Sequence, residues 1–213
     1  VRGELAAINT SVYIFHPKHA FNITRQDSGD LRGDVFFTCQ DLLTHGSRAQ
    51  GEDYEWISHW ALELIPRSLM NLEPPHKDTA RTIFKSLLGY MGDKQMEYPL
   101  VLAQDILRQG METFELRDEI YLQMMKQLTQ NQVAASILKG WQLMCMCTST
   151  FAPTTSFQNF LLNFLIDQSK KHGIVGVYAR YCQRTLQGTL EAGASGFLPS
   201  IEEIMAYDER PPV

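Results

Sequence analysis

The sequence predicts an all-α protein, a compact multi-helix bundle of about eight helices preceded by a weakly patterned N-terminal extension. From about residue 53 onward, apolar residues recur three and four positions apart, the spacing that places them on one face of an α-helix. The connections are short, and neither strand–helix alternation nor a hairpin signal interrupts them. We therefore expect an extension over residues 1–33, a helical domain over residues 34–207 and a linker over residues 208–213.

The region before residue 74 predicts one helix and a turn. An apolar stripe ends at Pro66, and a short turn leads to a break at Pro74 and Pro75. The stripe consists of Trp56, Ile57, Trp60, Ala61 and Leu64.

Two helices are predicted next. Residues 80–91 carry an apolar face over about three turns, with Asp78 placed as the cap and Gly92 as the stop. A second helix is expected with Pro99 in its first turn and an end near Gly110.

Residues 115–131, ELRDEIYLQMMKQLTQN, predict an amphipathic helix that carries more charges and amides than a core helix needs. Thr113 is placed to cap it, and Asp118 and Glu119 lie early, where the helix dipole favours acidic residues. Its wide apolar face is made of Leu116, Ile120, Met124 and Leu128 beside Tyr121 and Met125.

The last third of the chain predicts four more helices. Residues 134–149 are apolar nearly all round, which indicates a central helix. Helical stripes follow over residues 157–165 and 175–186, the second ending before Gly193. Ser200–Glu203 forms a capping box that begins a short final helix.

Composition argues against several functional classes. The 213 residues are 44% hydrophobic and 20% charged, enough apolar material for a sizeable core. The net charge of −5 argues against a nucleic-acid partner, because phosphate contacts need a basic excess. No run approaches the roughly 20 apolar residues of a transmembrane helix, and no signal segment lies near Val1. The start at Val1 rather than Met leads us to expect a piece of a longer protein.

The cysteines predict buried free thiols in a reducing cytosol. Cys145 and Cys147 are separated by one residue rather than the roughly two to four of a structural zinc site, and they lie in an apolar run. The other two are Cys39 and Cys182.

No catalytic or cofactor motif is present. The chain has no P-loop, no G-x-G-x-x-G after a strand, no G-x-S-x-G and no H-E-x-x-H. Pro17 separates His16 from His19, which favours a surface pair over a metal site. Glu115 and Glu119 lie four apart, so a carboxylate pair stays open, but the Glu-x-x-His companion of di-iron sites is missing. We expect no enzyme, no metal and no cofactor.

One basic cluster stands out: Lys170, Lys171 and His172, then Arg180 and Arg184. Positive charge after a helix suits its carboxyl end, so these residues can serve the helix alone. They can also form a patch for an acidic partner. The sequence leaves both interpretations open.

Five segments, in order, resemble the myosin tail homology 4 domain. "LRDEIYLQMMKQLTQN" (116–131) resembles its signature helix. "IPRSLMNL" (65–72) resembles an early P-x-x-S-L segment, and "ARTIFKSLLGYMGD" (80–93) resembles an element ending in Y-M-G-D. "KGWQLMCMC" (139–147) resembles its Gly-Trp central helix, and "PSIEEIMA" (199–206) its closing helix.

The resemblance covers about residues 60–207 and implies a helical, non-catalytic interaction module. Such domains occur in the tails of unconventional myosins, in a plant-type kinesin and in motorless adaptors with pleckstrin-homology domains. A FERM domain usually follows, and "DERPPV" is placed where it would begin. The implied location is cytoplasmic and cytoskeleton-associated, the implied partners are protein cargo, acidic peptides or microtubules, and the isolated domain is expected to be a monomer.

The resemblance also implies which residues specify the fold and leaves the basic cluster as the candidate partner surface. The helix 116–128 is expected to pack on the Gly140–Trp141 helix, with Arg117, Asp118 and Glu119 tying helix ends together. The full set of fold residues is Gly92, Asp93, Arg117, Asp118, Glu119, Tyr121, Gln127, Gly140, Trp141 and Pro199.

The chain departs from the family pattern before its closing helix. Many members carry basic residues around a Gly pair there, whereas "LEAGASGFLPS" (190–200) has none and Glu191 adds a negative charge. Microtubule binding through that loop is therefore disfavoured, and Lys170, Lys171, Arg180 and Arg184 are the remaining partner-binding candidates.

Overall fold

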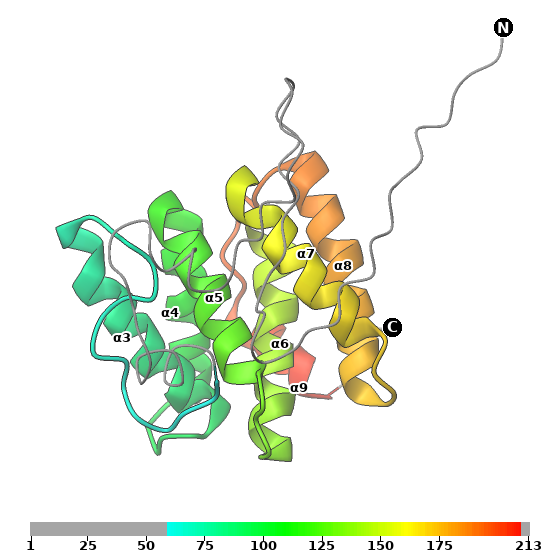
Figure 1. Ribbon diagram of the computed structural model, residues 1–213, viewed down its shortest axis with the longest axis horizontal. Helices are drawn as coiled ribbons and strands as arrows, with labels where there is room; N and C mark the ends of the chain where they lie inside the picture. The colour runs from blue at the N-terminus through cyan, green and yellow to red at the C-terminus, as the bar shows by residue number, and fades with distance from the viewer. Residues whose placement is uncertain (1–58, 210–213) are drawn as a thin grey trace, which may run out of the picture.

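The computed structural model describes residues 59–209, which form an all-α bundle (Figure 1). Within this range seven α-helices and one short 3-10 helix follow one another without a strand, which confirms the predicted fold class. They are α3 (Pro74–Met91), α4 (Pro99–Glu112), η1 (Phe114–Leu116), α5 (Arg117–Leu128), α6 (Ala134–Thr150), α7 (Thr155–Ser169), α8 (Ile174–Ala192) and α9 (Ile201–Glu209).

Several predictions concern residues outside the described range. These are the extension over residues 1–33 and the side chains of His16, His19, Cys39, Trp56 and Ile57. The final helix continues to Glu209, so the first two residues of the predicted linker belong to α9.

Residues 59–73 contain no helix, so the helix predicted before Pro66 is wrong where the structure describes it. The backbone N–H of Ala61 donates to Gln127 Oε1 at 3.1 Å, and the Ala61 carbonyl accepts from Gln127 Nε2 at 3.0 Å. A side chain of α5 thus satisfies both backbone groups that a helix would have paired internally. This segment therefore packs against α5 instead of folding onto itself.

Two predicted caps are also wrong. α3 begins at Pro74, so Asp78 lies in its second turn and instead pairs with Arg81. Proline is tolerated at the start of a helix, because the N–H that it lacks would have no partner there. The Thr113 side chain makes no capping hydrogen bond; its carbonyl accepts from Leu116 N at 3.1 Å and begins η1 ahead of α5.

Other predicted helix ends are confirmed. Gly92 follows α3 with φ 78°, a left-handed conformation that glycine adopts at little cost. The capping box of α9 is complete: Ser200 N donates to Glu203 Oε2 at 2.8 Å and Glu203 N donates to Ser200 Oγ at 3.2 Å.

The predicted central helix is also confirmed. α6 lies in the middle of the bundle (Figure 1) and contacts α3, α4, α5, α8 and α9. Trp141 is 1% exposed, and its ring stacks on that of Phe164 at 6.0 Å between centroids. Cys145, Cys147 and Cys182 are buried free thiols, as predicted for these three. None of the described helices is both long and apolar enough to cross a bilayer.

Trp141→Ala should lower the free energy of unfolding by about 3–5 kcal/mol, because it removes a fully buried ring from the centre of the core. Chemical denaturation measures this. Phe197→Ala is the matched control: that ring is 87% exposed, so its removal should change stability by less than about 0.5 kcal/mol. A loss below about 1 kcal/mol for the Trp141 variant would contradict the packing of α6.

Candidate functional site

The most unusual feature of the bundle is that α5 is buried on every side, including its polar residues. Asp118, Glu119, Gln123, Lys126 and Gln127 are all between 0% and 7% exposed. A buried polar group without a hydrogen-bond partner costs roughly 1–3 kcal/mol. The hydrogen-bond partners of these side chains therefore show which segments pack against α5.

The first turn of α5 holds the ends of two other helices. Arg117 Nε donates to the carbonyl of Gly110 at 2.7 Å, in the last turn of α4. Asp118 accepts from the backbone N–H of Thr154 at 2.8 Å and from its hydroxyl at 2.5 Å. Thr154 is the N-cap of α7, so this carboxylate fixes where α7 begins. Both side chains therefore join the ends of neighbouring helices to α5.

Glu119 holds the segment before α3. Its carboxylate accepts from the backbone N–H groups of Leu69 at 2.8 Å and Met70 at 2.6 Å, and from Gln123 Nε2 at 2.8 Å. Burial raises the pKa of this carboxyl from 4.5 to about 7, and the three hydrogen bonds limit the rise. Burial also raises the pKa of Asp118, against the hydrogen bonds from Thr154.

The last turn of α5 holds the beginning of the described segment. Gln127 pairs with Ala61, as described above, and Lys126 donates to the carbonyl of His59. Burial lowers the pKa of the Lys126 ammonium from 10.5 to about 8, and the charge of Glu63 opposes that shift. Asp93, directly after Gly92, accepts from Trp60 Nε1 at 3.0 Å and so fixes the same segment to the end of α3.

Three further fold residues make close contacts between elements. Tyr121 donates its hydroxyl to the carbonyl of Phe151 at 2.6 Å. Gly140 lies so near α5 that an added Cβ would stand 2.8 Å from Leu128 Cδ2. The carbonyl of Pro199 accepts from Gln104 Nε2 at 2.8 Å, which joins the α8–α9 connection to α4.

Glu119 should make the stability of the protein depend on pH. Because its folded pKa of about 7 lies above 4.5, the folded state binds the proton more tightly than the unfolded chain does. The free energy of unfolding should therefore fall as pH rises between these values and level off above about 7. Glu119→Gln, which cannot ionise, should flatten this slope in urea denaturation at about pH 5 and about pH 7.5. Asp118 is the same in both proteins, so equal slopes would contradict the assignment to Glu119.

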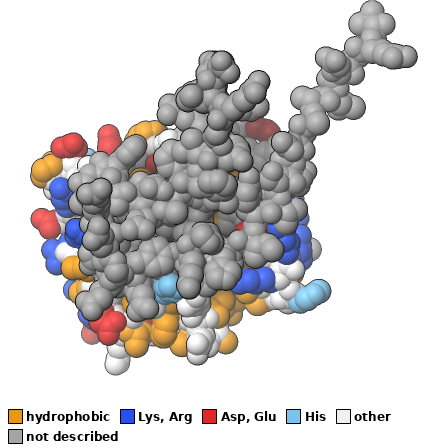
Figure 2. Space-filling view, viewed as in Figure 1, with side chains coloured by type: hydrophobic (Ala, Val, Ile, Leu, Met, Phe, Trp, Pro, Cys, Tyr) orange, Lys and Arg blue, Asp and Glu red, His pale blue; other side chains and the backbone are white. Residues whose placement is uncertain are grey.

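Three of the four candidate partner-binding residues lie where α7 turns into α8, and the fourth, Arg184, lies further along α8. Lys170 and Lys171 directly follow α7, and Arg180 and Arg184 lie one turn apart on α8. Arg180 Nη1 donates to the carbonyl of Ser169 at 2.8 Å, which brings α8 and the turn together. Figure 2 shows Lys and Arg side chains gathered at the right-hand edge of this view, beside the turn.

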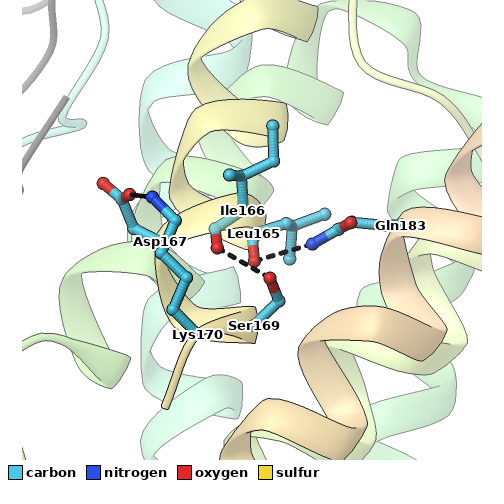
Figure 3. A network of polar contacts seen from close by, with 6 residues as sticks. All are labelled: Leu165, Ile166, Asp167, Ser169, Lys170 and Gln183. Carbon is cyan, nitrogen blue, oxygen red and sulfur yellow. Dashed lines mark hydrogen bonds and ion pairs between the residues drawn. The ribbon is translucent and has the colours of Figure 1, made fainter. Parts of the chain in front are cut away.

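These basic residues also serve the local structure. Lys170 pairs with Asp167 at 2.8 Å, while Ser169 Oγ bonds the Ile166 carbonyl and Gln183 bonds the Leu165 carbonyl (Figure 3). The contact of Arg180 with the Ser169 carbonyl satisfies a helix-terminal group, as the structural interpretation of this cluster predicts. The Arg184 guanidinium lies 5.8 Å from the centroid of the Tyr181 ring. Lys171 is exposed.

Two apolar side chains that were not among the predicted site residues lie beside these bases. Ile174 and Val177, in the first turn of α8, are 43% and 36% exposed. Ile174 and Val177 precede Arg180 by six and three residues, a helical spacing that the sequence shows. The apolar stripe over residues 175–186 predicts only the opposite, buried face of the helix. Among residues 59–209, no group of three His, Cys, Asp or Glu side chains is arranged to hold a metal ion.

The bundle and the buried contacts of α5 define an all-α domain, and comparison with known proteins identifies its family. Residues 103–206 match the model of the MyTH4 domain. Residues 103–206 thus form a MyTH4 domain, as the resemblance to the myosin tail homology 4 domain predicted.

Similar proteins include several myosins. The high molecular weight form of myosin-1 from Acanthamoeba castellanii is 40% identical over 147 residues, which are 69% of this chain and 9% of that protein. Myosin-VIIa of Drosophila melanogaster is 38% identical over 108 residues, or 51% of this chain and 5% of that protein. The chain thus spans less than a tenth of either relative.

Solved structures share the fold. The human Myosin 7b C-terminal MyTH4-FERM domain, in complex with the harmonin-a PDZ3 domain, gives a TM-score of 0.64 at 27% identity over 71% of this chain and 32% of that chain. The Dictyostelium discoideum Myosin VII MyTH4-FERM MF1 domain gives 0.66 at 26% identity over 76% of this chain and 34% of that one. This chain therefore spans about a third of each structure.

Proposed function

We propose that this chain is a non-catalytic protein-interaction module from the tail of an unconventional myosin, acting with a FERM domain that follows it in the same polypeptide. The observation that carries this proposal is the similarity to the MyTH4 part of MyTH4–FERM structures, at 26–27% identity over 71–76% of the chain. A motorless adaptor with pleckstrin-homology domains and a plant-type kinesin are less well supported, because the relatives reported above are myosins. The proposed location is cytoplasmic and cytoskeleton-associated.

The edge formed by Lys170, Lys171, Arg180 and Arg184 is the surface that we propose for partner binding. An exposed charge pair contributes only about 0–1 kcal/mol, so binding needs several of these charges to act together. Lys170, Lys171 and Arg180 lie together at the α7–α8 turn, and Arg184 lies about one helical turn further along α8, which supports their acting together. Acidic protein segments and microtubules, which present acidic surfaces, are the candidate partners.

The sequence of the parent transcript on both sides of this chain tests the proposed context. We expect a motor domain upstream and a FERM domain downstream, because both similar proteins and similar structures come from myosins. Pleckstrin-homology domains without a motor would replace the motor-tail proposal with the adaptor.

Microtubule co-sedimentation tests the proposed surface. The chain should pellet with microtubules at low salt, where charges are least screened, and Lys170→Glu with Lys171→Glu should abolish pelleting. Lys77→Glu with Lys85→Glu is the matched control, since it makes the same change in net charge at two exposed lysines of α3. Absence of wild-type pelleting, or equal losses in the two variants, would remove microtubules as a partner of this edge.

A further inference from the structure

The exposed face of α8 carries a ridge that is apolar at one end and basic at the other. Ile174, Val177, Arg180 and Arg184 follow one another at i+3, i+3 and i+4, so their side chains lie in one row along the helix. The opposite face of α8 includes Cys182 and Leu186 and is buried. The row therefore points away from the core, and its two apolar members are 43% and 36% exposed.

The turn before α8 adds a second pair of bases at the apolar end of the ridge. The carbonyl of Lys171 lies 2.1 Å from where a Cβ on residue 176 would stand, so Gly176 allows the turn to fold back onto the first turn of α8. Arg180 donates a hydrogen bond to the Ser169 carbonyl, and this contact joins α8 to the end of α7 at the same turn. Lys170, Lys171 and the guanidinium of Arg180 therefore lie on the turn side of Ile174 and Val177, and Arg184 lies beyond them along α8.

Along this part of the chain, acidic residues lie only at the two ends of the basic stretch. Between Asp167 and Glu191 the sequence contains no Asp or Glu, while it contains two lysines and two arginines. Asp167 pairs with Lys170, and Glu191 accepts from Gln187 at the far end of α8. A stretch with four positive charges and no negative one is exceptional in a chain whose net charge is −5.

We propose that this ridge binds an acidic segment of a partner protein that presents apolar side chains between two groups of acidic residues. The proposal rests on the proposed function and specifies its partner class. Acidic groups would pair with the two sets of bases, and the apolar side chains would cover Ile174 and Val177. A purely acidic polymer would leave those apolar side chains in water, so apolar contact should discriminate between partners of equal charge.

Two synthetic peptides of equal charge test this proposal against the whole chain. One carries two leucines, spaced four apart, between two pairs of glutamates; the other has serine in place of both leucines. Isothermal titration or fluorescence anisotropy should show the leucine peptide binding about tenfold or more tightly. Ile174→Ser with Val177→Ser should remove this preference and leave the weak binding of the serine peptide unchanged. Val101→Ser is the matched control, because Val101 is 44% exposed on α4, and the preference should survive it.

A second pair of substitutions separates this inference from the proposed function. Lys171→Gln with Arg184→Gln should weaken both peptides, and this loss should shrink as salt is added, because salt screens charge but not apolar contact. Equal affinity of the two peptides for the wild-type chain would overturn the apolar part of the ridge while leaving an acidic partner in place. If neither peptide binds at low salt, the proposed surface itself is wrong.

Discussion

Burial of the polar residues of α5 is the constraint on which the rest of the bundle depends. Arg117 and Asp118 bond the end of α4 and the start of α7, and Glu119 and Gln127 bond the segment before α3. Each of these contacts joins a side chain to a backbone group that would otherwise lack a partner in the core. A shift of α5 by one residue would break all of them together. The helix therefore sets the relative positions of its neighbours through hydrogen bonds, in addition to the apolar packing that it shares with α6.

This arrangement separates the residues that build the fold from those proposed to bind a partner. The buried contacts of α5 reach the ends of helices and the segment before α3, whereas the exposed ridge lies on α8, which packs mainly on α6 and α7. Arg180 is the exception, since it bonds the Ser169 carbonyl and also belongs to the ridge. Its substitution would alter both the turn and the surface, which makes Lys171 and Arg184 the more informative positions.

Periodicity was enough to predict most helices, because their apolar stripes face a shared core. It failed before Pro66, where Leu64, a member of the predicted stripe, is 44% exposed and Gln127 takes up both backbone groups of Ala61. That partner lies 66 residues away in the sequence, and no local pattern indicates it. The same limit applies to Glu119, whose hydrogen bonds to Leu69 and Met70 span 50 and 49 residues. Its early position predicted a helix-dipole role and the family resemblance a role at helix ends, but neither indicated these two partners.

The candidate surface was predictable in part for a related reason. Four bases near one turn are visible in sequence, since Lys170, Lys171, Arg180 and Arg184 are neighbours along the chain. Whether they converge depends on how the turn folds, and this depends on Gly176 and on the Ser169 carbonyl. The exposure of Ile174 and Val177 depends in turn on which elements leave the face of α8 uncovered. Neither the convergence of the bases nor the exposure of the two apolar side chains can be predicted from a local sequence pattern.

The charge distribution can orient an acidic partner as well as bind it at this edge. The stretch between Asp167 and Glu191 carries +4, so a total of −5 leaves −9 on the remainder of the chain. An acidic segment is therefore repelled by most of the protein and attracted at one edge. At physiological ionic strength this discrimination acts within about 8 Å, the screening length, so it orients a partner only in the last stage of approach. Charge alone would bind many acidic partners at this edge. Contact with Ile174 and Val177, which lie among the basic residues, can discriminate between these partners.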